Sequence, residues 1–205
     1  MTKVGRPKHS NTPRDVAVLL KQSALDLFSR KNFSAVTIKE IGNEAGVTTA
    51  VIYYHYRDKN DLFNASIEHA LETALKRFEQ VSEGTDDPVR LIHEWLQLHV
   101  ELHSEIAKVL TLVIDYNHSS SQSTRVDAAI AHFYDTEKRL IIDCINKGQT
   151  LGVFTAGEPE HVSTLISTFL DGAVVRTQIA EEYDIERAIQ EFEQTLWAIL
   201  GYAAT

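Results

Sequence analysis

A short segment of the chain gathers small, hydroxyl-bearing, aromatic and basic side chains at helical spacing. Thr48, Thr49 and Ala50 are small enough to let a helix backbone approach base edges in the major groove of DNA. The phenol, imidazole and ammonium groups that follow can hydrogen-bond to phosphate oxygens. These groups belong to Tyr53, Tyr54, His55 and Lys59. The chemistry predicted for this segment is therefore recognition of a nucleic acid.

Two short helices separated by a glycine turn are predicted to position these side chains. The sequence Thr37-Ile-Lys-Glu40 has the pattern of a capping box, which begins a helix. Gly46 can adopt the positive φ that ends it, and Thr48 is expected to cap a third helix through about His55. A first helix, beginning near Pro13, packs behind them. This order of elements is typical of a helix-turn-helix.

The same residues resemble the N-terminal motif of the TetR (tetracycline-repressor-like) family of transcriptional regulators. The matching pattern is Thr37-Ile-x-x-Ile41-Gly-x-x-Ala45-Gly-Val47-Thr-x-x-x-Ile52-Tyr-Tyr-His-Tyr56-x-x-Lys59-x-x-Leu62. The resemblance is specific over residues 12–65, and Gly148 to Phe154 and Leu170-Asp-Gly-Ala are similar to later regions of many members. It implies a homodimer that binds a palindromic operator, usually represses transcription, and is released by a small-molecule effector.

The resemblance also implies roles for individual residues. Those expected to contact phosphates or the groove are Thr37, Thr48, Tyr54, His55 and Lys59. Those expected nearest the bases are Thr49, Ala50 and Tyr53. Position 50 is often Gly in the family, and the Ala50 methyl can either touch a thymine methyl or simply be tolerated. Tyr56 replaces the more usual Phe and is expected to pack in the core.

Residues 1–11 are expected to form a flexible, polar and basic arm, which adds a second candidate DNA contact through Arg6 and Lys8. Gly5-Arg6-Pro7 resembles the core of a minor-groove AT-hook, in which an extended Arg enters a narrow A·T-rich groove. The alternative is a disordered tail that adds only nonspecific affinity. Residues 1–60 carry a net charge of +5 and the rest of the chain −14, which predicts a basic head for phosphates and an acidic body.

The predicted fold class is all-α, with about nine helices and no sheet. An N-terminal three-helix domain is expected over residues 12–57 and a helical ligand-binding and dimerisation domain over 58–205, with 58–82 as a connecting helix. Later helices are expected from Asp87 through Leu102, over Ser104–His118, over about 124–148, and from Pro159 and Asp184. The lack of a long apolar run and the single cysteine, Cys144, predict a cytoplasmic protein with no membrane span.

The helical body is long enough to bind an effector as well as a second subunit. Pocket residues are predicted where an apolar stripe ends in a polar group, and the alternative for each of them is a place in the core. The candidates are Trp95, His99, His103, Tyr116, Phe133 and Arg176. The helices from Pro159 and Asp184 carry broad apolar stripes that resemble the dimerisation pair of the family or simply complete the monomer core. The dimerisation candidates are Leu165, Phe169, Ala173, Ile189, Phe192 and Leu196.

Three histidines invite a metal interpretation that the spacing does not support. His99 and His103 are four apart and are expected on one helix face, but His93-Glu94 has Gln97 where a zinc hydrolase needs its second His. We expect no metal and no cofactor. The sequence also has no phosphate loop and no activated nucleophile, so an enzyme is not predicted. A DNA-binding architectural protein without an effector remains the alternative.

Overall fold

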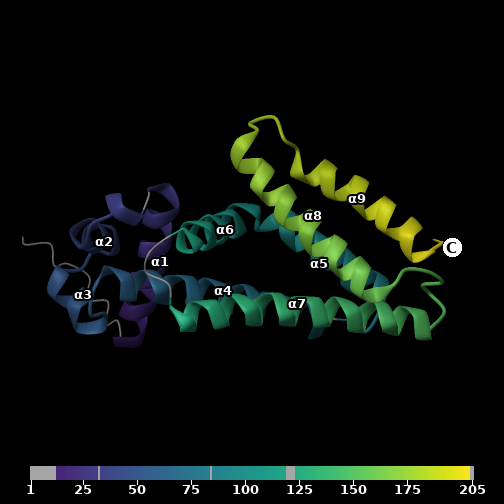
Figure 1. Ribbon diagram of the computed structural model, residues 1–205, viewed down its shortest axis with the longest axis horizontal. Coiled ribbons are helices and arrows are strands. Elements are labelled where there is room, and N and C mark those ends of the chain that lie inside the picture. The colour runs from purple at the N-terminus through teal and green to yellow at the C-terminus, as the bar shows by residue number, and fades with distance from the viewer. Residues whose placement is uncertain (1–12, 32, 84, 119–122, 204–205) are drawn as a thin grey trace, which may run out of the picture. The chain divides into compact units, whose positions relative to one another are not determined.

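The computed structural model describes residues 13–31, 33–83, 85–118 and 123–203. Within these ranges it contains nine α-helices, one short 3-10 helix and no strand, which confirms the predicted all-α class. The elements are α1 (Pro13–Arg30), η1 (Phe33–Ala35), α2 (Ile38–Ala45), α3 (Thr49–His55), α4 (Lys59–Glu83), α5 (Pro88–Glu101), α6 (His103–Asn117), α7 (Thr124–Thr150), α8 (Pro159–Ile179) and α9 (Ile185–Leu200) (Figure 1).

The chain divides into two compact units, one ending at Ser66 and the other beginning at Ile67. The division falls inside α4, so the first turns of this helix belong to the N-terminal unit and the rest to the C-terminal unit. The domain boundary predicted at residues 57 and 58 lies just before α4 begins.

The N-terminal unit is a small helical domain built around buried aliphatic and aromatic side chains. α1 packs against α2, and α2 packs against α3. The rings of Phe28, Phe33 and Phe63 contact one another at centroid distances of 4.9 to 5.6 Å. Ile41 of α2 and Ile52 of α3 are fully buried in the same unit. These apolar contacts fix α2 and α3 relative to α1.

Two of the predicted helix starts in the C-terminal unit, at Asp87 and Asp184, are confirmed by their caps. Asp87 accepts a hydrogen bond of 2.9 Å from the backbone N–H of Val89, and Pro88 occupies the first turn. Asp184 accepts one of 3.0 Å from the N–H of Arg187. In each case a short carboxylate satisfies an N–H that the helix leaves without a partner.

The C-terminal unit packs its helices in layers around one apolar core. α8 contacts α7 on one side and α9 on the other, and α5 contacts both α7 and α9 (Figure 1). Leu96, Ile145 and Val174 are completely buried at the centre. No helix among the described residues is long and apolar enough to cross a membrane.

One boundary differs from the sequence prediction and changes the position of a histidine. The helix expected to continue through Leu102 ends at Glu101, and α6 begins at His103. Leu102 has a ψ of 13°, so the backbone leaves the helical conformation there. The expectation that His99 and His103 share one helix face is therefore wrong, because they belong to different helices.

Candidate nucleic-acid interface and ligand pocket

The predicted capping box holds the start of α2. The Thr37 N–H donates to Glu40 Oε2 at 2.8 Å, and the Glu40 N–H donates to Thr37 Oγ1 at 3.2 Å. Lys31 Nζ donates to the other oxygen of Glu40 at 2.8 Å. The hydrogen bond from Lys31 and then those from Thr37 lower the pKa of Glu40 to about 2. The Thr37 hydroxyl is thus already used within the chain, although the residue is exposed.

The turn between α2 and α3 depends on a glycine in the left-handed region. Gly46 has a φ of 68° and a ψ of 26°, and its N–H donates to the Asn43 carbonyl at 3.2 Å. The Val47 N–H donates to the Gly42 carbonyl at 2.9 Å. A side chain at position 46 strains this conformation, so the predicted role of Gly46 as a helix stop is confirmed.

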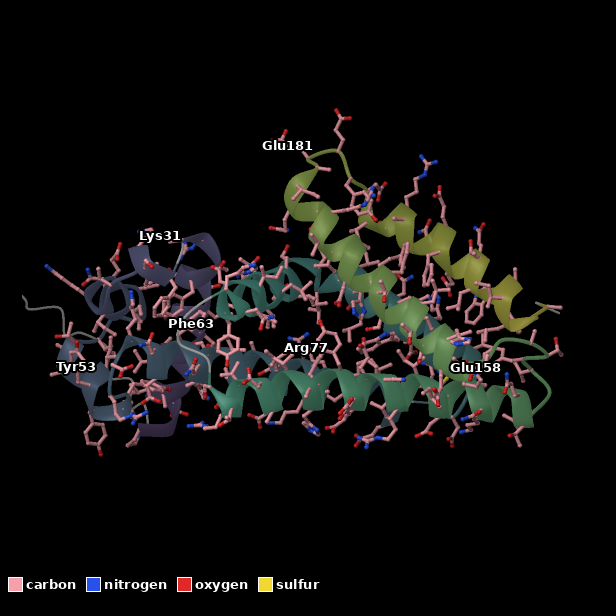
Figure 2. All side chains as sticks on the ribbon, viewed as in Figure 1. Lys31, Tyr53, Phe63, Arg77, Glu158 and Glu181 are labelled. Carbon is pink, nitrogen blue, oxygen red and sulfur yellow. The ribbon has the colours of Figure 1, made fainter. Side chains whose placement is uncertain are left out.

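Helix α3 has a buried side and an exposed side. Ile52 is fully buried, and Val51 is partly buried next to it. Tyr53, labelled in Figure 2, is 58% exposed, and Tyr54 is 80% exposed. Thr49 and Ala50 are also exposed and precede them by one turn. At 100° per residue, positions 49, 50, 53 and 54 fall within one arc of the helix surface.

The next two aromatic residues lie outside this exposed arc. His55 is partly buried and its ring contacts the edge of the Tyr54 ring at a centroid distance of 5.1 Å. The Tyr56 hydroxyl donates to the Ala17 carbonyl at 3.3 Å, and burial raises the pKa of Tyr56. Tyr56 therefore joins α3 to α1, in agreement with the packing role expected for it.

Lys59 makes internal contacts that the sequence did not predict. Its ammonium donates to the carbonyls of Phe33 and Val36, each at 2.8 Å. It also lies 4.3 Å from the centroid of the Phe33 ring. Burial lowers the pKa of Lys59. These contacts tie the first turn of α4 to the segment that leads into α2.

The other cations of the N-terminal unit differ in how far they are engaged. Arg30 pairs with Glu44 at 2.9 Å, and Lys31 pairs with Glu40. Lys39, on α2, is exposed and makes no ion pair within the described part of the chain. The sequence analysis did not name Lys39 as a candidate DNA contact. It lies two residues after the Thr37 cap, in the first turn of α2. Arg6 and Lys8 lie outside the described residues.

The C-terminal unit contains a largely apolar pocket between α4, α5, α6, α7 and α8. Its free space, counted out to its open mouth, is about 710 Å³. Figure 2 labels Arg77, which reaches the pocket from α4. The lining residues are Leu71, Ala74, Arg77, Trp95, Leu98, His99, Leu102, Ile106, Val109, Leu110, Val113, Ile130, Phe133, Tyr134, Glu137 and Asp171.

Half of the predicted pocket residues line this space. Trp95, His99 and Phe133 do, whereas the other three candidates lie elsewhere. His103 bonds the Val100 carbonyl at the start of α6. Tyr116 is completely buried, and its hydroxyl donates to Asp127 at 2.8 Å. Arg176 lies in a separate surface hollow next to Tyr183.

Two carboxylates lie in the pocket wall, and both hydrogen-bond to neutral hydroxyls. Ser167 Oγ donates to Glu137 Oε2 at 2.7 Å, and the Tyr134 hydroxyl donates to Asp171 Oδ2 at 3.0 Å. Glu137 is only 4% exposed. Burial raises its pKa to about 7, with a further rise from Asp171, against a lowering by the Ser167 hydrogen bond. Burial also raises the pKa of Asp171.

His99 and Trp95 are the remaining buried polar side chains of the wall. His99 Nδ1 lies 3.0 Å from the Trp95 carbonyl. Burial lowers the pKa of His99 to about 4, so the ring is neutral near pH 7. A carbonyl only accepts hydrogen bonds, so Nδ1 carries the proton and Nε2 is an acceptor. The Trp95 indole N–H is buried and has no hydrogen-bond partner among the described residues.

The predicted dimerisation residues divide into buried and surface positions. Ala173, Ile189, Phe192 and Leu196 belong to the core of the single chain. Phe192 stacks on Phe169 at a centroid distance of 3.9 Å. Phe169 is partly buried, and Leu165 is 42% exposed. Of the six, Leu165 and Phe169 are thus the ones that a second chain can reach.

The three histidines considered for a metal are separated. His93 is exposed and its Nδ1 lies 2.8 Å from Glu193 Oε1. His99 and His103 each bond a backbone carbonyl in a different place. Across the residues that the structure describes, no group of three or more His, Cys, Asp or Glu side chains is arranged to hold a metal ion.

Comparison with known families identifies the N-terminal unit. Residues 21–66 match the family model described as bacterial regulatory proteins, tetR family. This span contains α2, the Gly46 turn, α3 and the first turns of α4. The match therefore covers the elements that carry the exposed arc of α3.

Known proteins that resemble the chain are described as regulators. It is 31% identical over 110 residues to the HTH-type transcriptional regulator HbdR of Aromatoleum sp., covering 53% of this chain and 45% of that protein. It is 36% identical over 78 residues to the HTH-type transcriptional regulator AcrR of Shigella flexneri, covering 38% and 36%. The matched regions thus span less than half of the length of these two relatives.

A solved structure extends the fold comparison to most of the chain. A transcriptional regulator from Saccharomonospora viridis, solved in complex with choline, superposes with a TM-score of 0.74. The two share 19% sequence identity, and the match covers 90% of this chain and 96% of that one. This similarity supports the fold, with an N-terminal helix-turn-helix followed by a helical C-terminal part.

Proposed function

This chain belongs to the TetR family of bacterial regulatory proteins, and we propose that it regulates transcription as an operator-binding homodimer. Two copies of α3 enter successive major grooves of a two-fold symmetric DNA site. A small molecule that binds the C-terminal unit releases the DNA. Repression is the expected sign of the regulation.

The observation that carries the proposal is the two-sided character of α3. Its inner side is anchored by the buried Ile52, while Thr49, Ala50, Tyr53 and Tyr54 share the exposed arc. Two adjacent, highly exposed tyrosines on a helix of seven residues are typical of a surface that binds a partner. Their rings have apolar faces, and their hydroxyls can contact bases or phosphates.

The contacts suggest a division of roles among these residues. Thr49, Ala50 and Tyr53 are proposed to face the bases, and Tyr54 with the exposed Lys39 to contact phosphates. Lys59 is proposed to act mainly as a positioning residue, because two carbonyls already hold its ammonium. Thr37 has a similar part, since its hydroxyl and backbone N–H complete the cap of α2.

The proposed dimer contact is an exposed stripe along α8. Leu165, Phe169, Gly172, Arg176 and Ile179 recur every three or four residues and fall on one side of the helix. Leu165 and Ile179 are 42% and 76% exposed, and Gly172 is exposed as well. An isologous contact through this stripe relates two chains by the two-fold axis that a palindromic operator requires.

The pocket of the C-terminal unit is the proposed effector site. Leu71, Ala74 and Arg77 of α4 line it, and the same helix begins at Lys59 in the N-terminal unit. An effector with different affinities for two positions of α4 shifts the population between them. The structural neighbour described with choline supports the view that this fold can hold a small organic molecule.

The proposal is tested by selecting genomic DNA fragments with the purified chain. We expect enrichment of a two-fold symmetric sequence with half-sites about one helical turn apart or a multiple of it. Protein with Tyr53→Ala and Tyr54→Ala should lose this enrichment and keep its helical circular dichroism. Failure of the unchanged protein to enrich any sequence over bulk DNA contradicts the proposal.

A further inference from the structure

Three side chains in the wall of the pocket in the C-terminal unit offer hydrogen-bond acceptor atoms. Glu137 and Asp171 each contribute a carboxylate, and neutral His99 contributes its Nε2. Apart from the exposed Arg77, the rest of the wall is aliphatic or aromatic. Phe133 and Tyr134 lie on α7 with Glu137, and Asp171 lies on α8. A ligand that satisfies such a wall needs an apolar body and a head group that donates hydrogen bonds.

Neither carboxylate has a cationic partner. Among the described residues, no Lys or Arg forms an ion pair with Glu137 or Asp171, whose hydrogen bonds come from Ser167 and Tyr134. Arg77 is the guanidinium of the wall, but it is exposed and makes no ion pair with either carboxylate within the described part of the chain. Buried charges in proteins are usually paired, and no cation of the described residues pairs with these two carboxylates.

A second feature of the wall is a buried indole N–H without a hydrogen-bond partner in the described part of the chain. Trp95 is 7% exposed and lines the pocket, and its indole N–H has no partner among the described residues. Buried indole N–H groups are normally hydrogen-bonded. Because this N–H has almost no accessible surface, a bound molecule can reach it only if the surrounding side chains move.

We propose that this pocket binds an amphiphilic organic amine, with its protonated nitrogen on Glu137 and Asp171 and its apolar body against the aliphatic wall. The aromatic rings of Phe133 and Tyr134 add cation–π attraction to the same head group. The inference rests on the proposed function, in which this pocket is the effector site, and it names the chemical class of that effector.

The electrostatics of the pocket agree with this assignment. Burial and the proximity of Asp171 raise the pKa of Glu137 to about 7. An ammonium placed between the two carboxylates favours their charged forms and replaces the proton that Glu137 otherwise retains. An anionic ligand has the opposite effect, since it adds a third negative charge to an acidic wall.

The experiment compares three probes of matched shape on the full chain by isothermal titration calorimetry. The probes are 4-phenylbutylamine, 4-phenylbutanol and 4-phenylbutyrate, which carry a positive, a neutral and a negative head group. We expect the amine to bind at least about tenfold more tightly than the alcohol or the carboxylate, because its ammonium forms an ion pair with the carboxylates of the pocket. In the Glu137→Gln, Asp171→Asn double variant, the amine should bind no better than the alcohol.

A matched control separates this effect from a general change of charge. Asp135→Asn removes an exposed carboxylate of the same helix and should leave the preference for the amine unchanged. Equal binding of amine and alcohol, tighter binding of the carboxylate, or no binding of any probe at millimolar concentration overturns the proposal.

Failure of the ligand class can be distinguished from failure of the proposed function. Operator selection does not use the probes, so an enriched palindrome without amine preference refutes the ligand class and leaves the regulator. Amine preference without any enriched DNA sequence refutes the regulator and leaves the ligand class.

Discussion

Replacement of Glu137 by Gln is predicted to stabilise the C-terminal unit at alkaline pH. Burial raises the pKa of Glu137 from its ordinary value of 4.5 to about 7. Between these two values the folded chain holds a proton on this group that the unfolded chain has released. The free energy of unfolding therefore falls as the pH rises from 4.5 through 7. Gln is neutral throughout, and its amide oxygen can still accept the Ser167 hydroxyl.

The size of the effect follows from the difference between the two pKa values. A rise from 4.5 to about 7 corresponds to about 3 kcal/mol once the carboxyl is fully ionised in both states. Between about pH 5.5 and about pH 8.5 the destabilisation grows by roughly 2 kcal/mol. The difference in unfolding free energy between Glu137→Gln and the unchanged chain should increase by this amount over the same range.

Tryptophan fluorescence during urea unfolding measures this difference selectively. The chain has two tryptophans, and Trp95 and Trp197 both lie in the C-terminal unit. Asp135→Asn on the exposed side of α7 is the matched control and should show no comparable pH-dependent gain. A difference that stays constant with pH, or a Glu137→Gln variant less stable than the unchanged chain at high pH, refutes the reasoning.

Four further predictions concern the N-terminal unit and the proposed dimer contact. Thr49→Ala should weaken binding to the selected operator by about 1–3 kcal/mol in competition assays, without an equal loss on unrelated DNA. Lys39→Ala should lower the slope of log affinity against log salt concentration by about 1 and leave the melting temperature unchanged. Lys59→Met should instead destabilise the N-terminal unit by about 1–2 kcal/mol in thermal unfolding, because two carbonyls lose their donor. Leu165→Asp should give folded monomers in sedimentation, whereas Phe192→Asp should unfold the chain; folded dimers of Leu165→Asp would contradict the α8 contact.

Most elements set by local interactions were predicted well, although the Thr48 side chain makes no cap hydrogen bond to α3. The capping box at Thr37 and Glu40, the Gly46 turn and the carboxylate cap at Asp87 depend on residues within one turn of each other. Their chemistry is complete in a short stretch of sequence, so tertiary packing does not change it. The same locality allowed the family motif to be recognised.

Side-chain partners set by distant segments were not predicted. The carbonyls that hold Lys59 come from residues 26 and 23 positions earlier in the chain, which no local pattern reveals. The apolar stripe of α9 could not be assigned from the sequence to the core or to a dimer interface, because the two surfaces have similar compositions. Ile189 and Leu196 lie in the core of the single chain, where α5 and α8 cover them.

Glu137 is the residue for which the sequence carried a signal that was not used. Val126, Ile130, Phe133 and Ile141 recur along one side of α7, and Glu137 occupies the position of that stripe between the last two. A carboxylate in an apolar stripe lowers the free energy of unfolding at neutral pH, so a replacement by Gln at this site should increase stability. Buried ionisable groups that lower the free energy of unfolding are expected at sites where they bind a ligand. The unfolding experiment measures that cost without any ligand, and the probe titration measures the affinity gained in return. Both are required, because a cost with no amine preference makes Glu137 a feature of the fold rather than of effector binding.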